Sequence, residues 1–355
     1  MPAIPAAKPA PTIAILGATG LVGETLIKML EERNVPVGKL VPLASERSAG
    51  KTITFRGETI PVIALSAEAF QGVDIVLASA GGSISAEWAP VAVKAGAIVI
   101  DNTSHFRMDE DVPLVVAGVN DAACHAHHGI IANPNCSTAQ LMPVLKALNA
   151  ANPLTDVIIA TYQSVSGAGK DAMQELAEHS QHETCPAPKQ FQRSIAFNLI
   201  PHIDAFMEDW QGDTTFAGYT KEEAKLILET RKILDLPKLP ITATAVRVPV
   251  MVGHSEAVTL RFANPMDPKT VAQILAETPH VIVGHAPHDY HTPKEIAGTD
   301  PVYVSRIRRD TANPTHGISL WVVADNLRIG AALNAVRIAE YVIAHQLYGK
   351  TPAIV

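Results

Sequence analysis

A cysteine stands where a proline-bearing turn leads into an apolar helical pattern. Residues 133–138 read NPNCST and continue directly into QLMPVLKAL. At such a helix start the thiol of Cys136 lies beside backbone N–H groups that have no helical partner, and the positive end of the helix dipole favours its thiolate form. The structural alternative is a buried cysteine that acts only as a small hydrophobic residue. Cys136 is therefore a candidate nucleophile, and the other motifs of the chain distinguish this role from that of a buried hydrophobic residue.

A glycine-rich turn follows the first predicted strand. The strand TIAIL spans residues 12–16, GATGLVG follows at 17–23, and ETLIKMLEER continues with helical spacing. Glycines in a strand-to-helix turn allow backbone N–H groups to approach a pyrophosphate at the helix N-terminus. The spacing is GxxGxxG rather than GxGxxG, and such turns also occur without a ligand. The flanking strand and helix favour dinucleotide binding.

The segment after the second predicted strand bears on which dinucleotide is bound. Residues 44–51 read ASERSAGK, and Ser45, Arg47 and Ser48 could hold a 2′-phosphate. A protein that binds NAD commonly has an acidic residue here for the ribose hydroxyls. Glu46 leaves NAD open, and a solvated turn is the structural alternative. The pattern favours NADP.

Composition and cysteine usage limit the class of protein. The chain has 355 residues, of which 47% are hydrophobic, so it is long enough for about two globular domains. A net charge of -7 gives no sign of nucleic-acid binding, and we expect a small-molecule substrate. Cys124, Cys136 and Cys185 are widely spaced, unlike a disulfide framework, which fits the cytoplasm. Neither a signal peptide nor a membrane-spanning segment is indicated.

Strand-like and helix-like patterns alternate after the glycine turn. KLVPLA, VDIVLAS and AIVIDN are expected to be strands, and SAEWAPVAVKAG a helix between the last two. This alternation indicates a parallel sheet covered by helices, which is an α/β fold with a Rossmann-type doubly wound nucleotide-binding domain.

Ten short segments together resemble those of one enzyme family. They read GATGLVG, SERSAGK, SAGGS, IDNTSHFRM, NPNCSTAQ, TYQSVSGAG, ETRKI, ATAVRVPV, GHSEAV and DNLRIGAALNAV. With them the chain resembles the aspartate-semialdehyde dehydrogenases over nearly its whole length after the first ten residues. The resemblance implies NADPH-dependent reduction of aspartyl phosphate to the semialdehyde, with release of phosphate, on the route to lysine, threonine and methionine.

The resemblance also implies the roles of the residues that touch the substrate. Cys136 matches the nucleophile, Gln163 the residue that orients the substrate, and His254 the acid/base that takes the thiol proton. Matching positions for substrate binding are Arg107 and Asn135 at the phosphate, Lys225 beside them, Glu222 at the ammonium and Arg247 at the α-carboxylate. An exposed salt bridge is the structural alternative for Glu222 and Lys225, whereas Glu223 is explained as half of a capping box with Thr220.

Cofactor contacts are expected from both halves of the chain. The positions are Gly17, Thr19, Gly20, Leu21, Val22, Ser45, Arg47, Ser48, Ser79, Gly81, Ser166, Gly167 and Asn326. Asn326 precedes the last apolar segment, 327–347, which we expect to be one long helix.

Arg247 and His254 are seven residues apart, so in one regular strand their side chains would point to opposite faces. Pro249 and Gly253 lie between them, and such residues mark breaks or bulges. We therefore expect an irregularity between the two.

The expected domains are residues 1–132, completed by a C-terminal helix at 322–355, and an inserted α+β substrate and dimerisation domain, 133–321. We expect a homodimer. N-acetyl-γ-glutamyl-phosphate reductase is the catalytic alternative, and a non-catalytic paralogue that acts as a binding protein is the alternative of another class.

The tract HAHHG at 125–129 is expected to be a solvated loop rather than a metal site, and Cys124 and Cys185 are expected to be passive.

Overall fold

The computed structural model describes residues 10–182 and 186–349, which form two compact units. The first unit comprises the chain up to Pro113, Ala122–Asn133 and the chain from Ala335. The second comprises Leu114–Asp121 and Pro134–Asn334.

The first unit is built on a six-stranded parallel sheet in the order β5-β2-β1-β6-β7-β8. Its strands are β1 (Thr12–Leu16), β2 (Lys39–Ala44), β5 (Ile63–Ala64), β6 (Ile75–Ala78), β7 (Ile98–Asp101) and β8 (Ile130–Ala132), and β3 (Thr52–Phe55) with β4 (Glu58–Pro61) forms a hairpin. Helices of this unit are α1 (Leu21–Glu32), α2 (Gly82–Lys94) and α8 (Leu333–Ala344). The first two residues of α8 belong to the second unit, because the last segment of the first unit begins at Ala335. The four strands and two of the helices expected from sequence are confirmed, and the short apolar strands are buried because helices cover a parallel sheet.

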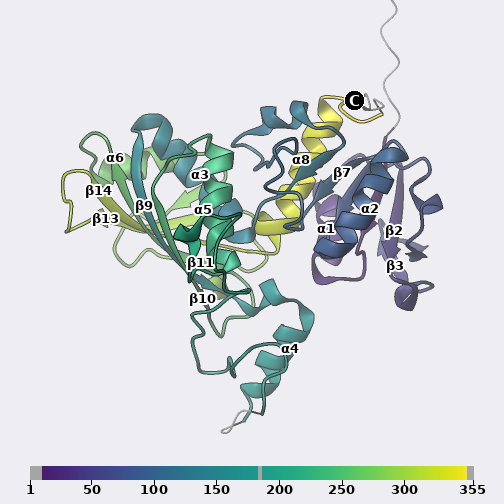
Figure 1. Cartoon of the computed structure of the whole chain (residues 1–355), viewed down its shortest axis with the longest axis horizontal. Helices are drawn as coiled ribbons and strands as arrows, with labels where there is room; N and C mark the ends of the chain where they lie inside the picture. The colour runs from purple at the N-terminus through teal and green to yellow at the C-terminus, as the bar shows by residue number, and fades with distance from the viewer. Residues whose placement is uncertain (1–9, 183–185, 350–355) are drawn as a thin grey trace, which may run out of the picture. The chain divides into compact units, whose positions relative to one another are not determined.

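The second unit contains a mixed six-stranded sheet in the order β10-β9-β11-β14-β13-β12. Its strands are β9 (Leu154–Gln163), β10 (Ile241–Arg247), β11 (His254–Phe262), β12 (Val281–Val283), β13 (Val302–Arg309) and β14 (Gly317–Ala324). Its helices are α3 (Cys136–Ala151), α4 (Lys170–His179), α5 (Lys221–Leu234), α6 (Pro268–Ala276) and α7 (Pro293–Ile296). Helices α3 and α5 pack beside each other and against strands of this sheet, whereas α4 extends from its edge (Figure 1).

The break expected between Arg247 and His254 is confirmed. Strand β10 ends at Arg247 and β11 begins at His254, with Gly253 between them in the left-handed region at φ 100°. The two strands flank β9, one parallel and one antiparallel, so both residues lie at the end of β9 where Gln163 pairs with Arg247. The alternation of faces is therefore reset between the two residues.

The expected long helix at 327–347 is interrupted. A π-helical turn occupies Arg328–Ala332, and α8 begins only at Leu333. The turn packs on α3 at Gly330, where a Cβ atom would lie 2.7 Å from the Cβ of Cys136. Residues 322–334, which the sequence assigned with the C-terminal helix, lie in the second unit, since β14 runs to Ala324.

Candidate active site

Cys136 is the first residue of α3, as its sequence context predicted. Asn135 is the N-cap, and its side-chain oxygen accepts a hydrogen bond from the Ser137 N–H at 2.9 Å. The backbone N–H of Asn135 in turn donates to the Glu229 carboxylate at 2.6 Å. The start of the helix is thus fixed from both sides, with the thiol in the field of its N-terminus.

His254 lies against the thiol. Its Nε2 is 3.1 Å from the Cys136 Sγ, and its Nδ1 is 3.1 Å from the backbone nitrogen of Ser164. A backbone N–H can only donate, so Nδ1 presents its lone pair there, and a neutral ring then carries its proton on Nε2. Burial, together with the nearby charge of Arg247, holds the pKa of His254 well below that of a free imidazole.

This tautomer bears on the expected acid/base role. With its proton on Nε2, a neutral His254 donates toward the sulfur and stabilises a thiolate, but it does not accept the thiol proton at that nitrogen. The alternative tautomer, with Nδ1–H donating to the Ser164 Oγ at 3.1 Å, would free Nε2 to act as a base. The backbone N–H of Ser164 favours the donor form.

Glu222 joins three of the predicted site residues. Its Oε1 accepts hydrogen bonds from the Asn135 Nδ2 at 2.8 Å and the Gln163 Nε2 at 3.1 Å, and its Oε2 lies 3.4 Å from the Lys225 Nζ. Glu222 is 7% exposed, so the exposed salt bridge considered for this pair does not describe it. Lys225 also pairs with Asp204 at 2.6 Å.

Glu223 has the structural role that its capping-box spacing predicted. Its Oε2 accepts from the Thr220 N–H at 2.8 Å, and the Thr220 Oγ1 accepts from the Glu223 N–H at 3.3 Å. Its Oε1 accepts from the Ala245 N–H at 3.0 Å, which ties α5 to β10. Glu222 therefore contacts the residues around Cys136, whereas Glu223 caps α5 and ties it to β10.

Arg247 is a buried cation close enough to Cys136 for their charges to interact. Its Nη1 donates to the Ser164 carbonyl oxygen at 2.7 Å. Burial lowers the pKa of its guanidinium below the usual range, and the charges of Glu222 and Cys136 oppose that shift. A Cβ on Gly167 would lie 3.2 Å from this Nη1 and 3.4 Å from the His254 Nε2, so the loop after β9 passes directly beside both side chains.

Ser166 and Asn326, which the sequence assigned to the cofactor, contact each other. The Asn326 Oδ1 accepts from the Ser166 Oγ at 3.1 Å, the Ser164 Oγ at 3.0 Å and the Gly253 N–H at 2.9 Å. Asn326 thereby links the loop after β9 to the residue before His254.

The glycine turn of the first unit fits a dinucleotide. Gly17 has φ 91°, and a Cβ there would lie 2.7 Å from the Ser79 carbonyl oxygen. A Cβ at Gly23 would lie 2.1 Å from the Gly17 carbonyl oxygen. No side chain caps α1, whose first residues are Leu21 and Val22. The turn is thus a bare backbone at a helix N-terminus, the arrangement that receives a pyrophosphate.

The remaining expected positions of the first unit lie around the ends of its strands. Ser45 and Arg47 are exposed after β2, and the Thr19 hydroxyl donates to the Ser48 hydroxyl at 3.4 Å. Ser79 follows β6, and Gly81, at φ 96°, precedes α2. Arg107 is 7% exposed and donates to the carbonyl oxygens of Asn133 at 2.9 Å and Asn102 at 2.7 Å.

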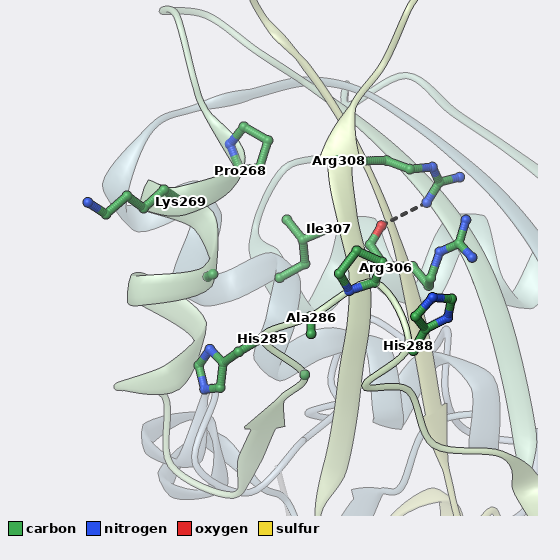
Figure 2. Close-up of a pocket in the computed structure, with 11 residues that line it drawn as sticks. Pro268, Lys269, His285, Ala286, His288, Arg306, Ile307 and Arg308 are labelled. Carbon is green, nitrogen blue, oxygen red and sulfur yellow. Dashed lines mark hydrogen bonds between the residues drawn. The ribbon is translucent and has the colours of Figure 1, made fainter.

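A cavity of about 590 Å³ in the second unit lies away from these residues. Figure 2 shows its lining, which includes the basic side chains of Lys269, His285, His288, Arg306 and Arg308. None of the predicted site residues lines it. The residues around Cys136 and His254 are therefore separate from the lining of this cavity.

The residues set aside on sequence grounds have ordinary surroundings where they are described. His127 accepts a hydrogen bond from the Gly129 N–H at 3.0 Å, His125 lies 3.2 Å from the Tyr341 hydroxyl, and Cys124 is buried. Cys185 lies outside the described residues. Within 10–182 and 186–349, no group of three or more His, Cys, Asp or Glu side chains is arranged to hold a metal ion, and no helix is long and apolar enough to cross a bilayer.

Two family models together match most of the chain. The model described as "Semialdehyde dehydrogenase, NAD binding domain" matches residues 12–127, and "Semialdehyde dehydrogenase, dimerisation domain" matches residues 145–329. The aspartate-semialdehyde dehydrogenase of a Shewanella species is 47% identical over 337 residues, which cover 93% of this chain and 97% of the relative. The chain belongs to the aspartate-semialdehyde dehydrogenase family.

Solved structures of aspartate-semialdehyde dehydrogenases agree with this assignment. The enzyme II of Vibrio cholerae complexed with ASA has a TM-score of 0.90 and 45% identity, covering 95% of this chain and 99% of that one. The enzyme of Candida albicans with NADP has a TM-score of 0.72 and 25% identity, covering 95% and 99%. The resemblance, the α/β fold and the oxidoreductase class inferred from the sequence are confirmed.

Three residues that contact the predicted site residues were not expected from the sequence. Ser164 contacts the His254 ring, Glu229 accepts from the Asn135 N–H, and Gly330 leaves room for Cys136. Ser164 directly follows Gln163, so its place at the strand end was a usable signal. Glu229 and Gly330 are 93 and 194 residues beyond Cys136, and no local pattern connects them to it.

Proposed function

We propose that this enzyme reduces L-aspartyl 4-phosphate to L-aspartate 4-semialdehyde with NADPH, through a thioester on Cys136. The observation that carries the proposal is the 3.1 Å contact between the Cys136 Sγ and the His254 Nε2 at the first residue of α3. A thiol at a helix N-terminus beside an imidazole N–H and a buried arginine is stabilised as the nucleophilic thiolate.

In the first chemical step the Cys136 thiolate attacks the acyl carbon of the phosphorylated side chain. The C–S bond forms, the bond from carbon to the phosphate oxygen breaks, and inorganic phosphate leaves with the electron pair. We assign to the N–H of the His254 Nε2 the role of donating to the oxygen that becomes negative in the tetrahedral intermediate; its 3.1 Å contact with the Cys136 Sγ supports this role. The thioester that remains holds the aspartyl group on the enzyme.

Reduction of the thioester follows the same geometry. Bound NADPH would supply the hydride that adds to the thioester carbon. The His254 Nε2–H stabilises the resulting oxyanion, and collapse of that intermediate expels the Cys136 thiolate and releases the aldehyde. The thiolate is thereby regenerated, and each turnover consumes one hydride and releases one phosphate.

Substrate binding is proposed for the buried polar residues around the thiol. Arg247 binds the α-carboxylate through its planar fork, Glu222 faces the α-ammonium, and Gln163 orients the reacting carbonyl. Their support is the network in which Glu222 accepts from both Asn135 and Gln163 within 3.1 Å. Asn135, Lys225 and Arg107 are proposed to bind the phosphate group.

For the cofactor we propose NADP, bound by the glycine turn between β1 and α1. The finding that a family model for NAD binding matches residues 12–127 supports a nicotinamide dinucleotide in general. Arg47, exposed beside Ser45 and Ser48, supports the 2′-phosphorylated form. The proposed division is a nucleotide domain and a catalytic domain that also forms a homodimer, in line with the description of the family model at 145–329. We further propose that the enzyme works in the cytoplasm.

The reverse reaction tests the proposal. Aspartate semialdehyde, phosphate and NADP should give reduced nicotinamide, measured by its absorbance, and omission of phosphate should abolish steady turnover because nothing then cleaves the thioester efficiently. N-acetylglutamate semialdehyde is the matched control substrate. Faster turnover of that control would favour the reductase alternative, and no turnover of either would favour a binding protein.

A further inference from the structure

Glu256 is a buried acid that the reaction described above does not use. It follows His254 by two residues on β11, so both side chains lie on the same face of the sheet. Glu256 is 0% exposed, and neither carboxyl oxygen has a hydrogen-bond partner within the described part of the chain. A charged carboxylate without partners is among the most unfavourable groups to bury, so its presence needs an explanation.

Gln140 is the polar residue that α3 presents toward this strand. It lies four residues after Cys136, on the same face of the helix and one turn further along. Its Nε2 donates to the backbone carbonyl oxygen of His254 at 3.4 Å, while its own Oε1 has no partner among the described residues. Gln140 therefore connects the helix that carries the nucleophile to the strand that carries the histidine.

The surroundings of Glu256 favour its neutral form. Burial raises the pKa of this carboxyl group well above the usual range, and the side-chain amide of Gln140, close by but not in hydrogen-bonding geometry, opposes only part of the shift. Across the sheet, Glu256 pairs with Thr161 on β9 and Val322 on β14, which carry no charge. The titratable groups nearest to it on this face are His254 and Cys136, and further along the face Arg247 and Glu222 are both partners of Gln163. Asp156, Tyr162 and Arg261 lie on the opposite face.

A neutral carboxyl group complements Gln140. Protonated Glu256 has one O–H donor, which the Oε1 of Gln140 lacks, whereas an ionised carboxylate could only accept. Lys146, the other titratable residue of α3 besides Cys136, is exposed and ten residues further along the helix than the thiol. Arg247, the cation on this face, makes no contribution to the pKa of Glu256, so no nearby positive charge in the described part of the chain stabilises its ionised form.

We propose that Glu256 is a positioning residue that works as a neutral acid: it holds the Gln140 amide, which keeps the His254 strand and the Cys136 helix in register. In this arrangement the Cys136 Sγ and the His254 Nε2 are held 3.1 Å apart. This inference rests on the proposed role of Cys136 as nucleophile, and it adds a requirement for a donor, and not for a charge, at residue 256.

The test compares Glu256→Gln with Glu256→Leu. Glutamine supplies a donor without a proton to lose, so kcat and the pH dependence of Cys136 alkylation by iodoacetamide should stay within about twofold of wild type. Leucine fills the space without a donor, so kcat should fall by about tenfold or more, with a smaller change in KM, and the alkylation profile should shift along the pH axis.

Two further variants make the test specific. Val258→Ala is the matched control, because Val258 is buried on the same face of β11 two residues beyond Glu256; it should lower thermal stability and leave the alkylation profile near that of wild type. Gln140→Met breaks the same link from the helix side and should have the same effect as Glu256→Leu. It therefore serves as the test if Glu256→Leu folds poorly.

The outcomes are distinguishable. If Glu256→Gln is as impaired as Glu256→Leu, a charged carboxylate is required and the proposal is wrong. If Glu256→Leu and Gln140→Met behave like Val258→Ala, the residue only fills space. Alkylation of Cys136 needs neither substrate nor cofactor, so it tests the positioning role even if the wild-type enzyme fails to turn over aspartate semialdehyde.

Discussion

Glu222 and Glu223 are adjacent in sequence, yet their carboxylates have separate partners. Glu222 accepts hydrogen bonds from the side chains of Gln163 and of Asn135, the residue before Cys136. Glu223 accepts from the backbone N–H groups of Thr220 and Ala245. At the scale of single residues, function and stability are thus assigned to two consecutive positions of α5.

This division predicts different effects of one chemical change. Glu222→Gln removes the charge proposed to face the substrate ammonium, so the KM for aspartate semialdehyde should rise by about tenfold or more. Glu223→Gln should leave KM near wild type and lower the free energy of unfolding by about 1 kcal/mol, because it weakens a helix cap. Steady-state kinetics and urea unfolding measure the two effects, and equal kinetic losses in both variants would contradict the division.

Arg247 provides a second prediction at this scale, since its shape should matter beyond its charge. Arg247→Lys keeps a cation but replaces the planar fork by a single ammonium, which cannot reproduce two parallel hydrogen bonds to a carboxylate. A loss of about 1.5–3 kcal/mol corresponds to a fall in kcat/KM for the semialdehyde of about ten- to a hundredfold. Kinetics at saturating NADP and phosphate test this, and a kcat/KM within about twofold of wild type would mean that the carboxylate binds elsewhere.

At the scale of elements, what could be predicted depended on whether the signal was local. The start of α3 at Cys136 and the capping box of α5 were readable because cap residues and helical spacing lie within a few positions. The break between Arg247 and His254 was readable from Pro249 and Gly253. The π-helical turn at Arg328–Ala332 was not, because no local pattern marks it and it packs at Gly330 against Cys136, a distant part of the chain.

Strand β11 carries two buried titratable groups whose effects on stability have opposite pH dependence. The pKa of His254 is held well below its ordinary value, so below about pH 6.5 the unfolded chain binds a proton that the folded chain does not, and stability falls as the pH falls. The pKa of Glu256 is raised well above 4.5, so above that value the unfolded chain loses a proton that the folded chain keeps, and stability falls as the pH rises.

The Glu256→Gln variant isolates the second effect. Glutamine has no proton to lose, so the variant should gain stability relative to wild type as the pH rises above about 4.5, by at most about 1.4 kcal/mol for each pH unit until the raised pKa is passed. Urea unfolding of both proteins over a pH series measures the difference. If the difference in unfolding free energy between the two proteins stays constant from about pH 4 to about pH 8, Glu256 ionises normally in the folded protein.

For the whole molecule, the sequence patterns indicated the class of fold more fully than the arrangement of the site. Short apolar strands alternating with helices predicted the parallel sheet, because that pattern is a direct consequence of burial on both faces. The site in the second unit needs residues from α3, β9, α5, β10 and β11, which no spacing brings together in advance. There the resemblance to a known family supplied the residues, and the structure supplied their contacts.

The preference for NADP over NAD is a property of the whole enzyme, and the Arg47→Ala variant tests it. Arg47→Ala should raise the KM for NADP by about tenfold and leave the KM for NAD nearly unchanged, because only the 2′-phosphate forms a charge-assisted pair with the guanidinium. Glu46→Gln is the matched control within the same turn and should not reduce NADP affinity. If both Michaelis constants are unchanged in Arg47→Ala, the 2′-phosphate is held by other residues.

The central claim is that Cys136 carries the aspartyl group as a thioester, and intact-protein mass spectrometry tests it most directly. The enzyme is mixed with aspartate semialdehyde and NADP without phosphate, so that the acyl group formed by oxidation cannot be released by phosphorolysis. We predict that wild type gains the mass of one aspartyl group, located by peptide analysis to Cys136, while Cys136→Ala binds NADP and gains none. An aspartyl adduct on another residue, or turnover of Cys136→Ala near the wild-type rate, would contradict the account.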